Sequence, residues 1–173
     1  MRNKGIKLFT ILLLLLSACG NNDISEEQTR IYDGFKESLL NNGELVSSNI
    51  PFDYHIDVKE KGDKYLYEVT IDHPRIAMKS IQMLVLNPED LSTDYISSSK
   101  GIFDEKTYHM IPNQENTIDG YMKSLSLEGV SSQKDFKVFA MVSWKDGNGL
   151  NQTQAYFSFN VVNMEDVKAG SRS

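Results

Sequence analysis

The first feature of the chain is an alternation of apolar and polar residues that begins at Phe52. Apolar side chains occupy every second position over residues 52–58 and again over 65–71, which is the pattern of strands with one buried face. Residues 61–63, between the two runs, have the chemistry of a tight turn. The pattern therefore predicts an antiparallel hairpin, which ends at Pro74 because proline cannot donate a ladder hydrogen bond.

Further short strands are predicted along the rest of the chain. They lie at residues 81–86, within 101–112, and at 121–128, 136–144 and 153–162. Segments 81–86 and 136–144 are apolar on both faces, which indicates buried strands, whereas the serine-rich residues 89–100 predict a long loop. Sequential strands separated by turns predict a mainly β fold, an antiparallel immunoglobulin-like β-sandwich. Trp144 fits this fold, although the cysteine pair of antibody domains is absent.

One helix is predicted ahead of the strands, over residues 25–43. Ser25 and Gln28 have the spacing of a capping box, and residues 41–43 form a stop signal. The apolar stripe of this helix consists of Ile31, Tyr32, Phe35, Leu39 and Leu40. Two interpretations of the stripe remain open: a lid packed on the sheet, or a face that binds a partner.

The chain begins with a segment typical of an exported protein. Three basic residues precede an apolar run over residues 8–16, which as a helix would be about 14 Å long. That is too short to span a hydrocarbon core of about 30 Å, so we predict a signal peptide. Residues 16–19, Leu-Ser-Ala-Cys, resemble the bacterial lipobox. The resemblance implies that the thiol of Cys19 receives a diacylglyceryl group and that cleavage leaves this residue as the new N-terminus.

Acylation also accounts for the presence of a single cysteine, since Cys19 has no partner for a disulfide. Two acyl chains anchor a protein stably, whereas one chain binds a membrane only marginally. The predicted organisation is a signal peptide over residues 1–18, a lipidated tether over 19–24, the helix over 25–43, the sandwich over 50–163 and a flexible tail over 164–173. The predicted location is the extracytoplasmic side of the cell membrane.

Net charge argues against two classes of partner. The chain carries a formal charge of −6, and loss of the first 18 residues, with three basic groups and no acid, changes it to −9. An acidic domain without a basic run is not expected to bind nucleic acid. For the same reason it is not expected to dock on anionic lipid by charge, so the membrane link falls to the acyl chains.

Short stretches of the C-terminal two thirds carry a second resemblance. They are residues 76–78 with 81–83, residues 101–104, and residues 120–121 with 142–145. In these stretches the chain resembles a group of uncharacterised Gram-positive surface lipoproteins with an immunoglobulin-like domain. The resemblance implies the fold and the surface location, and it implies no activity.

The sequence shows no catalytic, metal-binding or cofactor-binding motif. The three histidines, His55, His73 and His109, lack the spacing of a helical metal pair and have no cysteine nearby. There is no Gly-x-Ser-x-Gly elbow. The acid pairs at 89–90 and 104–105 could flank a glycosidic bond, but adjacent loop acids are usually solvated surface groups. We therefore predict a protein that is not an enzyme and needs no cofactor or metal.

Three tyrosines are the candidate ligand-binding residues, because loops on a rigid scaffold commonly bind partners. Tyr95, Tyr108 and Tyr121 lie in or beside predicted loops, where their rings either stack on a ligand or plug the ends of the core. We expect a non-catalytic binding or assembly module whose partner is a protein or a wall polymer. The alternatives are an accessory subunit of a membrane complex and an enzyme acting on the cell wall.

Overall fold

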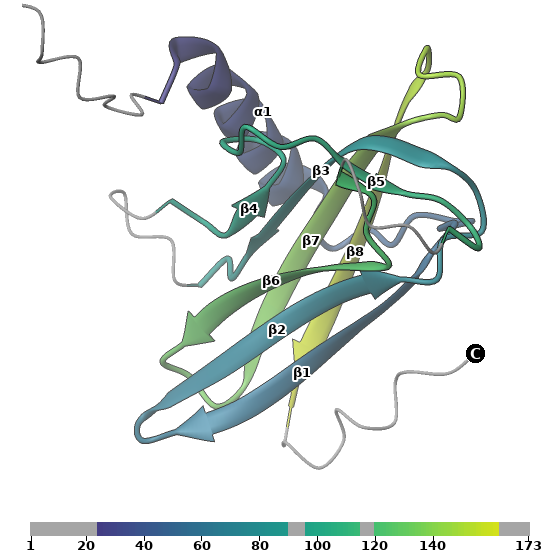
Figure 1. Ribbon diagram of the computed structural model, residues 1–173. Helices are drawn as coiled ribbons and strands as arrows, with labels where there is room; N and C mark the ends of the chain where they lie inside the picture. Colours follow the sequence, from purple (N-terminus) through teal and green to yellow (C-terminus); the bar gives the residue numbers. More distant parts are fainter. Residues whose placement is uncertain (1–23, 90–95, 115–119, 163–173) are drawn as a thin grey trace, which may run out of the picture.

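The computed structural model describes residues 24–89, 96–114 and 120–162 (Figure 1). The predictions made for Cys19, Tyr95 and the tail over 164–173 lie outside these residues. The elements are α1 (Glu26–Asn42), β1 (Asp53–Lys61), β2 (Lys64–Asp72), β3 (Met78–Leu86), β4 (Ser99–Lys100), β5 (Tyr108–Met110), β6 (Ser124–Ser131), β7 (Phe136–Lys145) and β8 (Gln152–Val161). Each predicted strand segment overlaps a strand, although β3 begins three residues earlier and β6 ends three residues later than predicted, and the helix has its predicted position.

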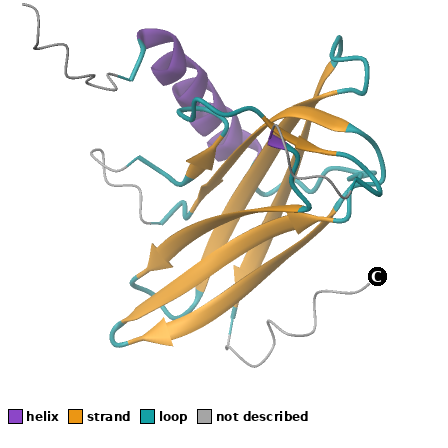
Figure 2. Cartoon of the chain, viewed as in Figure 1, coloured by secondary structure: helices purple, strands orange, loops and turns teal. Residues whose placement is uncertain are grey.

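The strands form two antiparallel sheets that face each other (Figures 1 and 2). One sheet has the order β1-β2-β6 and the other has the order β4-β3-β7-β8, with β5 pairing to β3. In the immunoglobulin fold strands A, B, E and D form one sheet, and strands C, F and G form the other. Here β1, β2 and β6 take the places of A, B and E, and β3, β7 and β8 take those of C, F and G, while no described strand takes the place of D. This division confirms the predicted immunoglobulin-like sandwich.

The main core lies between the two sheets, where alternate side chains of each strand point inward. Phe52, Trp144 and Phe157 meet edge to face at ring distances near 6 Å, the geometry that aromatic rings prefer. The largest fully buried members of this core are Phe52, Ile71, Met78, Ile81, Met83, Met110, Leu125 and Phe157. The sandwich therefore needs no disulfide to fill its interior.

Helix α1 packs on the outer face of the second sheet and adds a third layer (Figure 2). Tyr32, Phe35 and Leu39 are buried against residues of β3 and β7. This contact explains why β3 and β7 are apolar on both faces, one facing the other sheet and one facing the helix. Of the two interpretations of the helical stripe, the lid is confirmed for these three residues, while Leu40 remains 40% exposed.

The ends of α1 follow from local chemistry. The capping box is present, because the Ser25 hydroxyl accepts a hydrogen bond from the Gln28 amide and the Gln28 side chain accepts one from the Ser25 amide. Gly43 caps the other end with a right-handed backbone. A Cβ at Gly43 would overlap the ring of Phe139, so glycine is needed there for close approach of the helix to β7.

The segment after α1 is fastened to the edge of the second sheet. The backbone amide of Ser47 donates to the carbonyl oxygen of Tyr156 at 2.9 Å, and the Ser47 hydroxyl accepts from the Tyr156 amide at 2.9 Å. Tyr156 lies in β8, which is an edge strand. Part of an otherwise open edge is thereby covered, which reduces its tendency to pair with other chains.

Two details of the second sheet were not predicted. The predicted loop over 89–100 ends in the short strand β4, which pairs with Met83 and Leu84. Strand β3 also contains a bulge: its register against β7 shifts between Lys79 and Gln82. Ser80 within the bulge has a φ of +49°, which is rare for a residue other than glycine.

Candidate functional site

The outer face of the second sheet is divided along its strands into an apolar half and a polar half. Residues directly opposite each other on β3 and β7 form cross-strand pairs with side chains on the same face. The pairs, in order along the strands, are Leu86–Phe139, Leu84–Met141, Gln82–Ser143 and Lys79–Lys145. The first two pairs lie under α1, and the last two belong to the part of the face that the helix core does not include.

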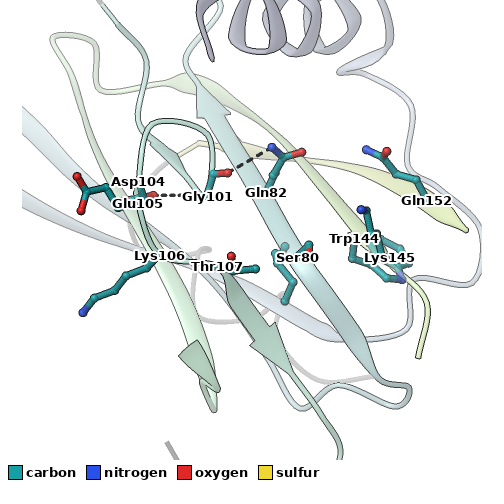
Figure 3. A pocket seen from close by; sticks show the side chains of 11 residues that line it. Ser80, Gln82, Gly101, Asp104, Glu105, Lys106, Thr107, Trp144, Lys145 and Gln152 are labelled. Atoms are coloured by element: carbon teal, nitrogen blue, oxygen red, sulfur yellow. Dashed lines mark hydrogen bonds between the residues drawn. The ribbon is translucent and has the colours of Figure 1, made fainter. Parts of the chain in front are cut away.

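A pocket of about 340 Å³ occupies the polar half (Figure 3). Its floor comes from β3, β7 and the start of β8, and its wall comes from the loop between β4 and β5. The lining residues are Ser80, Ile81, Gln82, Gly101, Asp104, Glu105, Lys106, Thr107, Trp144, Lys145 and Gln152. Because loops on a rigid sheet are common binding positions, this pocket is the candidate functional site.

The floor of the pocket is shaped by the bulge in β3. Bulges redirect side chains and are frequent beside functional sites. Here the backbone amide of Ser80 donates to Nδ1 of His109 in β5 at 3.2 Å. Burial lowers the pKa of His109, and the positive charge of Lys79 lowers it further. The imidazole is therefore held neutral, as an acceptor at Nδ1 requires.

Hydrogen bonds between strands fix the amide side chains of the floor. The Gln82 amide nitrogen donates to the carbonyl oxygen of Gly101 at 3.3 Å, and the Gln152 amide nitrogen donates to the buried hydroxyl of Ser143 at 2.8 Å. Both side chains are thus held in place before any ligand arrives. Such preorganisation lowers the entropic cost of binding.

The wall of the pocket is held by a tight backbone contact. Gly101 has a φ of +74°, and a Cβ at this position would overlap the carbonyl oxygen of Ile81. The Gly101 amide donates to the Asp104 carboxylate at 2.5 Å. Burial raises the pKa of the nearby Tyr108 hydroxyl, and the Asp104 carboxylate raises it further. The hydrogen bond from Gly101 to Asp104 therefore closes the loop between β4 and β5.

The predicted tyrosines have different positions. Tyr108 is only 9% exposed and belongs to the main core, so little of its ring is open to a ligand. The ring of Tyr121 lies 5.2 Å from that of His109, and His109 bonds to Ser80 of the pocket floor. Tyr108 and His109 are neighbours in β5, so their side chains point to opposite faces of the sheet. The ring of Tyr108 therefore points into the core, and the ring of Tyr121 lies with His109 on the other face. Tyr121 thus lies near the pocket floor through His109, and Tyr108 reaches the pocket wall only with its hydroxyl, beside Asp104.

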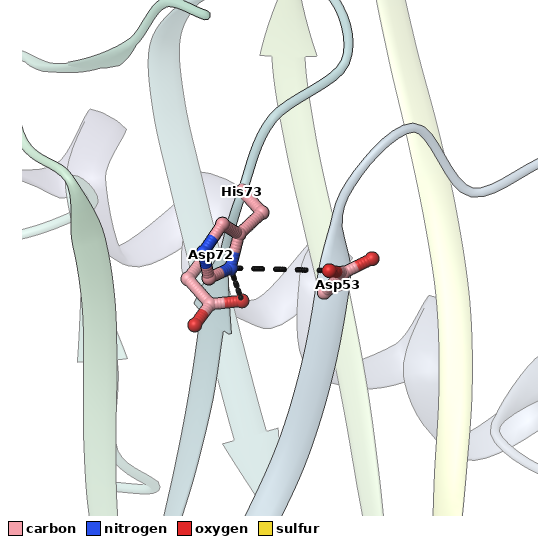
Figure 4. Close-up of side chains that lie close together, drawn as sticks. All are labelled: Asp53, Asp72 and His73. Carbon is pink, nitrogen blue, oxygen red and sulfur yellow. Dashed lines mark ion pairs between the residues drawn. The ribbon is translucent and has the colours of Figure 1, made fainter. Parts of the chain in front are cut away.

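A second cluster lies at the end of the first sheet, where Asp53, Asp72 and His73 meet (Figure 4). Nδ1 of His73 is 3.0 Å from Asp72 and 3.8 Å from Asp53. The two acids are directly opposite each other in the β1–β2 register. Sequence spacing did not reveal this cluster, because it depends on the register of the hairpin.

These three residues form an ion-pair network. Arg75 bonds to Asp53 at 2.6 Å, so one carboxylate of the cluster is already engaged. The hydrogen bond and charge of Asp72 raise the pKa of His73, which favours the protonated imidazole. An imidazole that binds a metal ion must be neutral. The positive charges of protonated His73 and of Arg75 balance the two carboxylates here, so the close approach of the two acids is explained without a metal ion.

The remaining histidine, His55, adds no further site. His55 lies in β1 with Nε2 at 3.7 Å from Asp57, and its side chain is one-third exposed.

Among the described residues no helix is long and apolar enough to cross a membrane. A comparison with known protein families finds no family that matches the chain, and a comparison with curated proteins finds no significant similarity.

Proposed function

We propose that the protein is a lipid-anchored, non-catalytic binding module on the extracytoplasmic side of the cell membrane. The lipobox-like residues 16–19 support the anchor, and the small rigid sandwich supports a role in binding. The observation that carries the proposal is the pocket on the polar half of the second sheet. A preorganised polar floor beside a loop is the arrangement expected of a site that recognises a small group.

The pocket favours binding over hydrolysis of wall material. Glycoside hydrolysis uses two carboxyl groups on opposite sides of the scissile bond, about 5 to 9.5 Å apart. The two acids of this pocket, Asp104 and Glu105, are neighbours in one loop, and Asp104 is bonded to Gly101. The geometry therefore supports a module that holds its ligand without cleaving it.

The anchor is tested by mass spectrometry of the N-terminal peptide of protein purified from membranes. We expect a peptide that begins with diacylglyceryl-modified Cys19. The Cys19→Ser variant should lack the modification and remain an unprocessed precursor. An intact Ala18–Cys19 bond with a free thiol in the wild-type protein would contradict the lipid anchor.

Binding is tested by thermal unfolding of the mature protein with fractionated envelope extract, since a ligand of the native state raises the melting temperature. We expect Thr107→Trp, which places a large ring at the pocket wall, to abolish the rise. Thr29→Trp, at an exposed position of α1, is the control and should retain it. An equal rise in all three proteins would exclude the pocket as the binding site.

A further inference from the structure

Three lysines, two on the sheet and one in the loop wall, concentrate positive charge at the pocket. Lys79 and Lys145 are directly opposite each other in the β3–β7 register, and Lys145 lines the pocket. Lys106 lines the same pocket from the β4–β5 loop. None of the three lysines forms an ion pair with another described residue.

This arrangement costs stability in the free protein. Like charges directly opposite each other on one face destabilise a sheet, and Lys79 is half-buried, which weakens the solvation of its charge. The charge of Lys79 also lies close enough to His109, beneath the pocket floor, to lower the pKa of that imidazole further, after burial. An anionic group placed between Lys79 and Lys145 would remove the repulsion and gain two charge-assisted hydrogen bonds.

The loop wall of the pocket carries charges of both signs, because Lys106 follows the acids Asp104 and Glu105 there. Glu105 is exposed and forms no ion pair with the described residues. Its carboxylate lies on the outer side of the loop and points away from the sheet floor (Figure 3). An acid group of a ligand therefore belongs beside the lysines of the sheet, and hydroxyl groups of the same ligand match the polar floor, where Gln82 offers hydrogen-bonding atoms.

We infer that the pocket binds a small hydroxyl-bearing ligand through a phosphate or carboxylate group held at the pocket margin between Lys79 and Lys145, with its hydroxyls toward Gln82. The inference rests on the proposed binding function, because it names the ligand class of the same pocket. The two lysines supply the charge, and the fixed side chain of Gln82 supplies oxygen and nitrogen atoms on the side toward the loop wall. The side chain of Gln152, in β8 opposite Lys145, borders the pocket on the other side.

The experiment is an NMR titration of the mature protein with three related probes. Glycerol 3-phosphate and glycerate carry the same hydroxyl chemistry with a phosphate or a carboxylate, and glycerol carries no charge. We expect one or both acids to shift the amide signals of Ser80, Gln82 and Lys145 in a saturable way, and glycerol to leave them unchanged. Comparing the two acids identifies which acid group the site prefers.

Matched lysine variants assign the effect to the pocket. Lys145→Gln should weaken binding of the acid probe about tenfold or more, the usual effect of losing a hydrogen bond to a charged group. Lys64→Gln is the control, because Lys64 and Lys61 form the same kind of opposed lysine pair in the β1–β2 hairpin, outside the pocket. Its affinity should equal that of the wild-type protein.

Three outcomes would overturn the inference. If Lys145→Gln and Lys64→Gln lose affinity equally, the probes respond to overall charge and not to this site. If neither acid shifts the pocket signals but an uncharged envelope component does, the binding function stands and the ligand class is wrong. If no probe and no envelope extract perturbs the pocket, both the inference and the proposed function fail.

Discussion

The two halves of one sheet face show how a partner element decides which residues a strand can carry. Under α1, the β3 and β7 positions are Leu84, Leu86, Phe139 and Met141, all buried. A few residues further along the same strands and face, beyond that cluster, the positions are polar and line or border the pocket. The apolar half contributes stability, and the polar half is open to a ligand.

The largest effect is expected from removing the helix contact. Leu39 is fully buried between α1 and the sheet, so Leu39→Ala should lower the free energy of unfolding by about 2–5 kcal/mol. Leu40→Ala, at the adjacent 40% exposed position, should cost about 0.5 kcal/mol or less. Urea unfolding measures both. Equal losses would mean that the helix does not stabilise the sheet through this face.

Substitution in the loop wall of the pocket should also lower the free energy of unfolding, although this loop is not part of an apolar core. Gly101→Ala combines a left-handed backbone with overlap of the Ile81 carbonyl and should cost more than about 2 kcal/mol. Gly149→Ala has the same kind of φ, +76°, but open space around the added methyl group, and should cost about 1–2 kcal/mol. Chemical denaturation gives the free energy of unfolding of both variants. The loss in Gly149→Ala measures backbone strain alone, and the additional loss in Gly101→Ala measures the overlap.

Reversing one pocket charge should increase stability slightly. Lys145→Glu replaces a like-charge pair with an ion pair to Lys79, which should raise the free energy of unfolding by about 0.2–1 kcal/mol. The gain should shrink in high salt, because salt screens surface charges. Lys64→Glu opposite Lys61 is the matched change without a pocket. Thermal unfolding at low and high salt measures both, and a loss of stability in Lys145→Glu would contradict the repulsion.

The smallest effect is expected at the cluster of Asp53, Asp72 and His73, whose two acids are balanced by protonated His73 and by Arg75. The pKa of His73 is raised in the folded state by the hydrogen bond and charge of Asp72. Its contribution to stability is therefore complete below the unfolded pKa, about 6.5, and is lost as the pH rises through the higher folded pKa.

The variant His73→Asn tests this pH dependence and tolerates the φ of +44° at this position. The difference in melting temperature between wild type and variant should be larger near pH 6 than near pH 9. In an Asp72→Asn background the pH dependence of that difference should diminish, since the principal partner is gone. A difference that is constant with pH would contradict the assignment.

The secondary structure and fold were largely predictable because their signals are local. The alternation over 52–58 fixed which face of β1 is buried, and the capping box at Ser25 fixed the start of α1. The apolar character of β3 and β7 on both faces correctly indicated burial on two sides. The sequence did not show which element would cover the second face, and the structure identifies it as α1.

The candidate site was not predictable because it depends on contacts between distant residues. Lys79 and Lys145 meet only through the β3–β7 register, and the bulge at Ser80 sets that register. Tyr108 was a candidate ligand-binding residue because it follows a loop, but pairing of β5 with β3 turns its ring into the core. Its hydroxyl reaches the pocket wall at Asp104, while Tyr121 approaches the pocket floor through His109.

The fastening of Ser47 to Tyr156 has a mechanical consequence. A chain pulled from its N-terminus transmits tension first through α1 and then to the two hydrogen bonds that join Ser47 to β8, one from its backbone amide and one to its hydroxyl. These bonds lie between the helix and β1 in the sequence, so they must break before tension can reach the first strand of the sandwich. The outer layer can thus detach under load while the two sheets, and the interior between them, remain assembled.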